Sequence, residues 1–548
     1  MERAIVMKIV PRLLMGFILG ILCFVTGCDN SKSLSEANRW QNDVPRYGGT
    51  LLIGTESRSD VLDPHIARGW VTYRVLYQIY EQLVKPEYTI DNGKVKVSVA
   101  PCLAKSWKVS PDGRVFTFYL RDDVKFHDGT SFDAEAVKIN VERASNRDSP
   151  YFNSKAAEIA CYLWKDLESI EAVDRLTIRF KFTQPFFEFP IVLVQGGLGS
   201  AGIISPAALE KWGNGRIGEH PIGTGPFRVV EISEKKVVLM QNQEYWGVKP
   251  YLNKVVFWSI PEPAARVNAL QVGDVDMIFA PSPRSIKELE EDGFIVARTT
   301  KAHVWYLSLN TTNPIFADIR VRRAMAMAIN KNGLAQELLA NTARPAHGLI
   351  PPTNLSFDPD YKSPPYDIAS AKALLVEAGY PDGFDLVLHT SVSGSGQILP
   401  VSIAKSIQRD LRKVNINVKI RTYEWIDYID QWRNGIEPEV GMNQMSWGMT
   451  ADYWIDIIVN SDNSSPRGYN TNRYCNPQVD NLLDTARAEP NPKTRAELYR
   501  RANELVMADL WHIPIVNDLA PIIMNQKVKG FVHASQEWYE MKQLWLSE

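Results

Sequence analysis

One stretch of the chain has a spacing that could bind a phosphate group. Residues Gly197 to Gly202 match the pattern GxGxxG, in which glycines let the backbone approach the pyrophosphate of a dinucleotide. Pro206 follows where the phosphate-binding helix should already be running, and a proline inside a helix removes a hydrogen bond and clashes with the preceding turn. We therefore expect a glycine-rich loop here and no dinucleotide site.

Other patterns typical of catalysis are missing from the sequence. It contains no HExxH, GxSxG or GxxxxGK[ST] segment, which are the usual patterns of metalloproteases, α/β-hydrolases and P-loop proteins. The 63 acidic residues and eight histidines show no metal-ligand spacing, and His65, His127 and His512 lie beside turn or strand signals. We expect a protein that is not an enzyme and that needs neither a cofactor nor a metal.

The first 46 residues predict export and attachment to a membrane. Basic residues precede an apolar run, residues 13–25, which is shorter than a bilayer-spanning helix and is typical of a signal peptide. Val25-Thr26-Gly27-Cys28 resembles a bacterial lipobox, so we expect cleavage after residue 27 and lipidation of Cys28. An ordinary cleavage site beside a chance cysteine is the alternative. Residues 28–46 are polar and predict a flexible tether.

Three cysteines, Cys102, Cys161 and Cys475, would remain in the mature chain beside a lipidated Cys28. They allow one disulfide at most. Without a CxxC segment or paired Cys/His spacing, the sequence does not predict a structural zinc site or a redox motif.

Length and charge restrict the class of protein further. A chain of 548 residues is too long for a single hydrophobic core, so several lobes are expected. The formal net charge is -2, and it becomes -4 without residues 1–27, because three cations and one acid are removed. Since a nucleic-acid surface normally needs a positive stripe, we expect no nucleic-acid partner.

The periodicity of apolar residues predicts both strands and helices. Apolar and polar residues alternate at residues 116–120 and 176–182, which indicates strands with one solvent-exposed face. Helical stripes follow Asp318 and Asp367, which can cap the free N–H groups, and Gly379 can end the second helix. A third helix is expected near Thr494 to Asp509. Strands mixed with helices indicate α/β lobes.

A series of segments resembles the family 5 extracellular solute-binding proteins, the peptide, nickel and related binders of ABC importers. Each segment alone is weakly specific, but their order behind a lipobox is very specific. The resemblance covers nearly the whole mature chain and lies in residues 61–64, 79–84, 103–107, 110–113, 116–129, 221–227, 242–246, 269–276, 309–310, 320–324, 366–375 and 377–381.

This resemblance implies an α/β clamp with two lobes, of the class II periplasmic-binding-protein type with the extra subdomain of large peptide binders. The implied parts are a signal peptide at 1–27, a tether at 28–46, a discontinuous lobe I at 47–65, 203–300 and 515–548, an extra subdomain at 66–202, and lobe II at 301–514. Two crossing segments are expected near Thr300 to Tyr306 and Ile513 to Asn517.

Peptide-binding relatives hold the ligand's α-ammonium with an acid in a loop that reads roughly Trp-x-Ala-Asp-Tyr. Here residues 447–454 resemble that loop, although it is longer, and Asp452 matches the acid. The ligand-binding residues implied are Asp452, with Trp447, Tyr453 and Trp454 as apolar walls, and, from the loop after Pro64, Arg68 for a ligand carboxylate and Trp70 as its cover.

The resemblance leaves the ligand open. A di- or oligopeptide is the leading interpretation, and an oligosaccharide, a heme or a nickel chelate is the alternative within the same class. Nickel-binding relatives carry a histidine after the acidic loop and an arginine before the helix at Pro206, and this chain has neither. A peptide-sensing or adhesive surface lipoprotein without transport is the alternative from another class.

The implied partners are the membrane subunits of an ABC permease, and the membrane itself through the lipid. We expect a monomer anchored in the cell envelope, on the periplasmic face of the inner membrane if the cell has two membranes.

Overall fold

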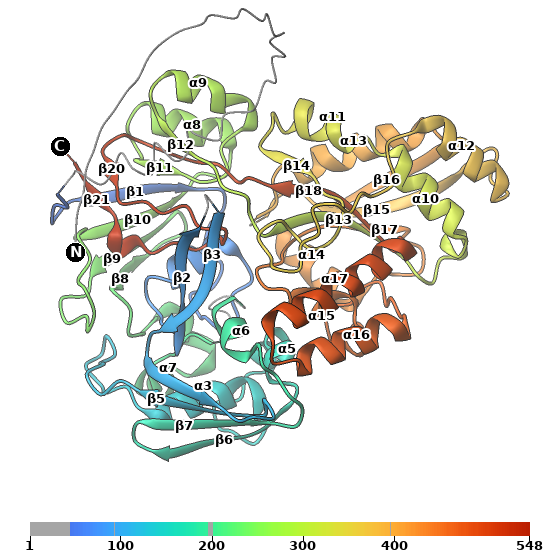
Figure 1. Cartoon of the computed structure of the whole chain (residues 1–548). Coiled ribbons are helices and arrows are strands. Elements are labelled where there is room, and N and C mark those ends of the chain that lie inside the picture. Colours follow the sequence, from blue (N-terminus) through green and yellow to red (C-terminus); the bar gives the residue numbers. More distant parts are fainter. Residues whose placement is uncertain (1–43, 92–93, 196–200, 395, 548) are drawn as a thin grey trace, which may run out of the picture. The chain divides into compact units, whose positions relative to one another are not determined.

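The computed structural model describes residues 44–91, 94–195, 201–394 and 396–547 (Figure 1). The predicted signal peptide, Cys28 and most of the predicted tether lie outside these residues, as do Gly197 and Gly199 of the GxGxxG segment. Within the described ranges, no helix has the length and apolar character needed to cross a membrane.

Lobe I, as we use the term, is built on a seven-stranded sheet. Strand β1 runs parallel to its neighbours β10 and β11. Its side chains alternate between two cores: Leu51 and Ile53 pack toward helices α2 and α7, and Leu52 packs toward α8 and α9. The strand order is β12 (Ile295–Ala297), β19 (Ile522–Met524), β11 (Met277–Ile278), β1 (Thr50–Thr55), β10 (Lys254–Ser259), β9 (Lys236–Gln241) and β8 (Phe227–Ile232). The helices are α2 (Trp70–Leu76), α7 (Pro206–Arg216), α8 (Pro263–Gln271) and α9 (Ile286–Glu291).

Lobe II is built on a six-stranded sheet that is also covered on both faces. Trp305 and Leu307 of β13 face α10, α12 and α13, whereas Val304 and Tyr306 face the side of α14, α15 and α17. The strand order is β14 (Ala343–Pro345), β18 (His512–Asp518), β13 (His303–Leu309), β17 (Met442–Gly448), β15 (Phe384–Ser391) and β16 (Ile416–Tyr423). The helices are α10 (Ile319–Ala328), α11 (Lys331–Gly333), α12 (Ile368–Glu377), α13 (Pro400–Arg412), α14 (Trp425–Asn434), α15 (Trp454–Val459), α16 (Pro477–Ala488) and α17 (Pro492–Asp509).

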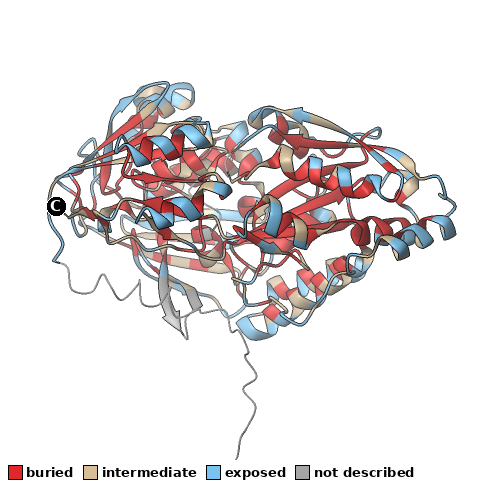
Figure 2. Ribbon diagram, turned by 90° about the horizontal axis from the view of Figure 1, so that it is seen from above, coloured by how far each residue is buried: buried red, intermediate tan, exposed pale blue. Residues whose placement is uncertain are grey.

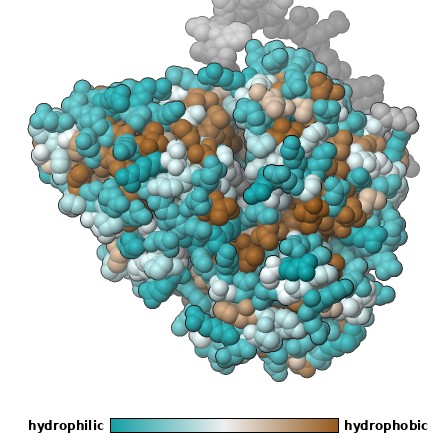
Figure 3. Space-filling view, turned by 180° about the vertical axis from the view of Figure 1, so that it is seen from behind, coloured by the Kyte–Doolittle hydropathy of each residue, from teal (hydrophilic) through white to brown (hydrophobic). Residues whose placement is uncertain are grey.

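The burial pattern follows from these layers. Figure 2 shows the strands of both sheets largely buried, while many helices turn an exposed face outward. On the face drawn in Figure 3 most of the surface is hydrophilic, and hydrophobic side chains are exposed in separate patches.

A smaller four-stranded sheet forms the core of the subdomain. Its strands, in order, are β4 (Ala104–Val109), β5 (Val115–Leu120), β7 (Thr177–Phe182) and β6 (Leu167–Asp174). Beside it lie the hairpin β2 (Val84–Asp91) and β3 (Lys94–Pro101) and helices α3 (Ala134–Ser145), α4 (Ser154–Ile159), α5 (Cys161–Trp164) and α6 (Phe189–Gln195). The small pair β20 (Val528–Lys529) and β21 (Trp545–Leu546) lies near the C-terminus. The apolar core of the subdomain is continuous with that of α14 to α17 of lobe II.

The chain passes twice between the two large sheets. Residues 298–302 join β12 to β13, and residues 519–521 join β18 to β19. The first crossing overlaps its predicted position. The second was predicted near Ile513 to Asn517, which was wrong, since these residues lie inside β18. Every residue of β18 is buried, and a strand buried on both faces lacks the alternation of apolar and polar residues that would have marked its bounds.

Local sequence signals produce the helix ends that were expected. The side chain of Asp318 accepts a hydrogen bond from the backbone N–H of Arg320, and Asp367 accepts one from Ser370. Gly379 has a φ of 90°, which favours glycine and ends α12. The predicted division into lobe I, subdomain and lobe II stays a prediction; Ala67 and Val75, which it assigned to the subdomain, pack in the core of lobe I.

Candidate ligand-binding site

The predicted ligand-binding residues lie where parallel strands of the two large sheets end. In lobe II, β15 and β17 run parallel and end at Ser391 and Gly448. In lobe I, β1 ends at Thr55, and the following loop leads to Arg68 and Trp70. In open α/β sheets ligands bind outside the carboxyl ends of the strands, where loops present side chains over exposed backbone groups. This edge is the candidate site.

Trp447 lies in an aromatic cluster of lobe II. Its ring is stacked on Trp432 of α14, with centroids 5.1 Å apart and an angle of 28° between the planes. The rings of Tyr469 and Trp454 lie 5.4 and 5.9 Å from it. Such contacts fix the indole in one orientation, and the role of Trp447 as a ligand wall stays a prediction.

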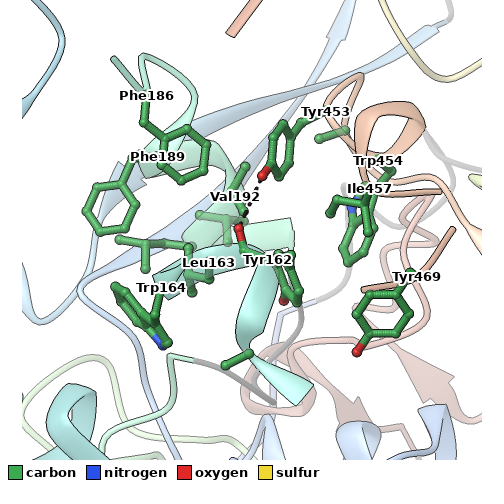
Figure 4. Close-up of a cluster of buried hydrophobic side chains, with 14 of the residues drawn as sticks. Tyr162, Leu163, Trp164, Phe186, Phe189, Val192, Tyr453, Trp454, Ile457 and Tyr469 are labelled. Atoms are coloured by element: carbon green, nitrogen blue, oxygen red, sulfur yellow. Dashed lines mark hydrogen bonds between the residues drawn. The ribbon is translucent and has the colours of Figure 1, made fainter. Parts of the chain in front are cut away.

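Tyr453 and Trp454 pack against the subdomain (Figure 4). The Tyr453 hydroxyl donates to the carbonyl of Tyr162 at 3.1 Å, and its ring lies 5.3 Å from Phe186. The Trp454 indole donates to the Thr450 hydroxyl at 3.0 Å. Both side chains are buried in this arrangement. Their contacts hold lobe II against the subdomain, and a role as ligand walls stays a prediction.

Asp452 is a half-buried acid that has only neutral hydrogen-bond partners. Its Oδ1 accepts hydrogen bonds from the backbone N–H and the hydroxyl of Ser356. Burial raises the pKa of Asp452 above its usual value, while the hydrogen bonds from Ser356 and Asn354 lower it in part. Within the described ranges, no lysine or arginine forms an ion pair with this carboxylate. A half-buried carboxylate in this state can accept a cationic ligand group.

A second acid, Glu188, lies on the subdomain side of the same region. The Tyr499 hydroxyl donates to it at 2.5 Å, and Arg495 lies 3.6 Å away. Burial raises the pKa of Glu188 to about 7, with the nearby charge of Asp452 contributing in the same direction. The positive charge of Arg495 acts on both acids and lowers the pKa of each in part.

Arg68, in the loop before α2 of lobe I, reaches lobe II. Its guanidinium forms an ion pair with Asp430 of α14, whose side chain is 54% exposed. The backbone N–H of Arg68 donates to Asp60 at 2.9 Å, which fixes the loop. The structure thus brings Arg68 to Asp430 of α14, whereas Asp452 is hydrogen-bonded to Ser356.

A group of uncharged polar side chains on α14, on strands β13, β15 and β17 and in the loop after β15 was not predicted from the sequence. Their buried atoms find no hydrogen-bond partner within the described part of the chain, although buried polar groups normally have one. The atoms are His303 Nε2, Ser391 Oγ, Gln397 Oε1, Trp425 Nε1, Gln431 Oε1, Trp432 Nε1, Asn443 Oδ1, Gln444 Oε1 and Trp447 Nε1.

Several contacts connect members of this group. Gln431 donates to His389 Nδ1 at 2.9 Å, and His389 is the register partner of Asn443 between β15 and β17. Tyr428 donates to the carbonyls of His389 and Gln444, so α14 is held over the sheet. The spacing of Trp425, Tyr428 and Trp432 on one helical face was a signal that could have identified this wall.

The remaining reactive side chains have structural surroundings. His65 lies 2.8 Å from the Gly202 carbonyl through Nε2, and burial lowers its pKa to about 4. His127 lies 2.9 Å from the carbonyl of Gly225 in the same way. Cys102, Cys161 and Cys475 are unpaired. In the described ranges no three His, Cys, Asp or Glu side chains are grouped so that they could hold a metal ion.

Comparison with known proteins places these features in context. The model of the bacterial extracellular solute-binding proteins, family 5 (middle region), matches residues 98–466. The glutathione-binding protein GsiB of Salmonella paratyphi A is 29% identical over 490 residues, which are 88% of this chain and 91% of that protein. GsiB of Shigella boydii serotype 4 is 30% identical over 491 residues, with the same coverage.

Two solved structures share the fold. The periplasmic binding protein DppA of Helicobacter pylori, in complex with the peptide STSA, is 28% identical with a TM-score of 0.82 and covers 94% of this chain and 100% of its own. A dipeptide-binding protein of Pseudoalteromonas sp. SM9913, in complex with Met-Leu, has a TM-score of 0.80 over 91% of this chain and 100% of its own. At 24% identity, this second likeness concerns the fold alone.

Proposed function

The chain belongs to the bacterial extracellular solute-binding proteins of family 5, the substrate-binding components of ABC importers, and we propose that its ligand is a di- or oligopeptide. The observation that supports this proposal most directly is the Asp452 carboxylate, half-buried at the sheet edge with neutral hydrogen-bond partners. Arg495 acts on Asp452 only from a distance, so a peptide's α-ammonium would be the cation in direct contact with this carboxylate.

A cationic group fits Asp452 better than a neutral group does. Its carboxylate is partly desolvated, which favours the protonated form, and a positive charge at hydrogen-bond distance reverses that preference. Glu188 adds negative potential from the subdomain when lobe II is packed against it. An α-ammonium enclosed here would be hydrogen-bonded by Asp452 and attracted by both acids.

The uncharged polar atoms on α14 and on the neighbouring strands suit the rest of a peptide. Indole N–H groups of Trp432 and Trp447 can donate to peptide carbonyls, and the side-chain oxygens of Asn443 and Gln431 can accept from peptide N–H groups. The stacked indoles offer apolar area at low cost in conformational entropy. This combination binds backbone and apolar side chains with little dependence on sequence.

Arg68 is the proposed partner of the ligand's carboxylate. Its present partner, Asp430, is more than half exposed, and exposed ion pairs contribute little free energy. A ligand carboxylate inside the cleft could therefore replace Asp430. Trp70, two residues further along, was predicted to cover this pair, and its indole lies between the rings of Trp538 and His303.

Glutathione is the first specific peptide to be tested. Two relatives of about 30% identity are named glutathione-binding proteins. Glutathione carries an α-ammonium and carboxylates, so it offers the charges that Asp452 and Arg68 would bind. The other solutes considered, an oligosaccharide, a heme or a nickel chelate, lack this pair of charges on one small chain.

Delivery to an ABC permease and attachment through a lipid on Cys28 complete the proposal. The protein would then lie in the cell envelope, facing the periplasm in a cell with two membranes, and act as a monomer. The alternative from another class, a sensory or adhesive lipoprotein, would bind peptide in the same cleft without supporting uptake.

Native mass spectrometry of the protein purified from its own host would identify a retained ligand. Isothermal titration with glutathione, Met-Leu and a tetrapeptide such as STSA would then test the class directly. We expect binding of at least one of them with a stoichiometry of one. Binding of none of these, together with a retained sugar or metal complex, would refute the peptide assignment.

A further inference from the structure

Trp70 of lobe I lies in direct contact with lobe II. It is the first residue of α2, and its indole is stacked on Trp538 of lobe I with centroids 5.5 Å apart and an angle of 24°. On its other side lies His303, the first residue of β13 in lobe II, with ring centroids 5.4 Å apart. The indole therefore stands between an aromatic support in its own lobe and a ring of the other lobe.

Two glycines of lobe II leave the space that the indole occupies. A Cβ atom at Gly448, the last residue of β17, would lie 3.0 Å from Trp70 Cζ2 and 3.2 Å from His303 Nε2. A Cβ atom at Gly396 would lie 2.5 Å from Trp70 Cδ1 and 2.9 Å from His303 Cε1. Interiors are close-packed, so a side chain at Gly396 would collide with the ring, and one at Gly448 would require the ring or the strand to shift by a few tenths of an ångström.

The two glycines differ in their backbone conformation. Gly396 has a φ of 71°, so its backbone conformation alone favours glycine. Gly448 needs no such conformation, because it continues the regular register of β17 opposite His303 of β13. At position 448 it is therefore the rings of Trp70 and His303, and not the backbone conformation, that limit the space for a side chain.

Both sides of this contact are held in place. In lobe II, His303 Nδ1 lies 3.1 Å from the Ser446 hydroxyl, and Gln397 donates to the Ser446 carbonyl at 3.1 Å. In lobe I, the Tyr73 hydroxyl donates to the Ala67 carbonyl at 2.7 Å, and the Tyr73 ring lies edge-on to the Trp70 ring with centroids 5.7 Å apart. Contacts within each lobe therefore hold the groups on both sides of this contact.

The contact also lies beside a crossing between the lobes. His303 follows directly on the crossing at residues 298–302. When the lobes separate about such a crossing, an indole that belongs to lobe I must leave a slot that belongs to lobe II. The packing of Trp70 is then gained in the closed state and lost in the open state.

We propose that Trp70 is a positioning residue for closure: its indole fits a slot formed by Gly396, Gly448 and His303, and this fit stabilises the closed clamp. The inference deepens the proposed function and rests on it, since a closed clamp is what retains the ligand. A group that favours the closed state raises ligand affinity without touching the ligand. This role differs from that of a cover over the ligand.

Gly448→Ala is the direct test, and Gly215→Ala is its matched control. A Cβ atom at Gly215 meets nothing within 4 Å and, as at Gly448, needs no unusual φ. Overpacking of a filled site should weaken binding of Met-Leu or glutathione by roughly ten- to a hundredfold in Gly448→Ala. The control should bind like the native protein. Ligand-free melting temperatures of the two variants should agree within a few degrees.

A double variant tests whether the indole is the cause. Trp70→Ala removes the ring that the new methyl group would meet, so Trp70→Ala with Gly448→Ala should bind no more weakly than Trp70→Ala alone. If Gly448→Ala alone fails to fold, recovery of folding in the double variant supports the same contact. Additive losses in the double variant would overturn the proposal.

A readout without ligand separates this inference from the peptide assignment. Oxidation of Trp70 by hydroxyl radicals, followed by mass spectrometry of its peptide, should be faster in ligand-free Gly448→Ala than in Gly215→Ala. If that difference appears while neither glutathione nor Met-Leu binds the native protein, the peptide assignment fails and the closure role stands. Equal oxidation in the two variants together with unchanged affinity would refute the closure role.

Discussion

Replacing Asp452 should reveal whether a peptide's α-ammonium lies against its carboxylate. Removing one member of a buried charge pair costs about 2 to 5 kcal/mol, because the other charge is left enclosed without a partner. Asp452 is half-buried and keeps some contact with solvent, which places it at the lower end, about 2 to 3 kcal/mol. Asp452→Ala should therefore weaken peptide binding about 30- to 150-fold.

The comparison with N-acetylated peptide isolates the charge pair. Acetylation removes the ammonium, so it should weaken binding to the native protein strongly but weaken binding to Asp452→Ala only slightly. Asp427→Asn is a suitable control, since it removes one negative charge from an exposed position of the same lobe. Calorimetry on the four combinations would show losses that do not add; additive losses would refute contact between Asp452 and the amine.

The pH dependence should follow from the same carboxylate. Burial raises the pKa of Asp452 in the ligand-free protein, and a bound ammonium favours its ionised form. Affinity should thus be full above the raised pKa and should fall as the pH drops through it. For N-acetylated peptide the affinity should change little over this range. A fall of equal size for both peptides would assign the effect to another group.

Three further predictions concern other residues. Arg68→Ala should weaken binding of a peptide with a free carboxylate more than binding of its C-terminal amide, and equal losses would indicate that Arg68 acts only through Asp430. Burial raises the pKa of Asp518 to about 8 in the folded protein, far above the value of about 3.9 expected in the unfolded chain. The free energy of unfolding therefore has its full contribution from this carboxyl group below about pH 4, and this contribution is lost as the pH rises through 8. Asp518→Asn stays neutral and should unfold at a higher urea concentration than the native protein at pH 8, by about 1 kcal/mol or more, whereas a lower midpoint would contradict this. Cys28→Ala should release the protein from the membrane fraction, because it removes the acylated side chain; retention after complete signal cleavage would contradict lipidation.

Much of the local structure could be predicted from the sequence because its causes are local. The residues that alternate at 116–120 and 176–182 lie in β5 and β7, as predicted. Asp318 and Asp367 cap the helices that were expected after them. A side chain's preference for a cap, a turn or one face of a strand depends on near neighbours in the chain. The order of such segments also identified the family, and the family implied the two-lobed clamp.

The contacts between distant segments could not be predicted in this way. Trp70 meets Gly448, and Tyr453 meets Tyr162, only because two sheets and a subdomain are brought together by the crossings of the chain. The family resemblance implied Trp70, Tyr453 and Trp454 as ligand contacts, which stays a prediction; their contacts with Trp538, His303 and Tyr162 became visible only in the tertiary structure. Chain connectivity, burial and close packing decide such contacts, and none of these is a property of a short segment.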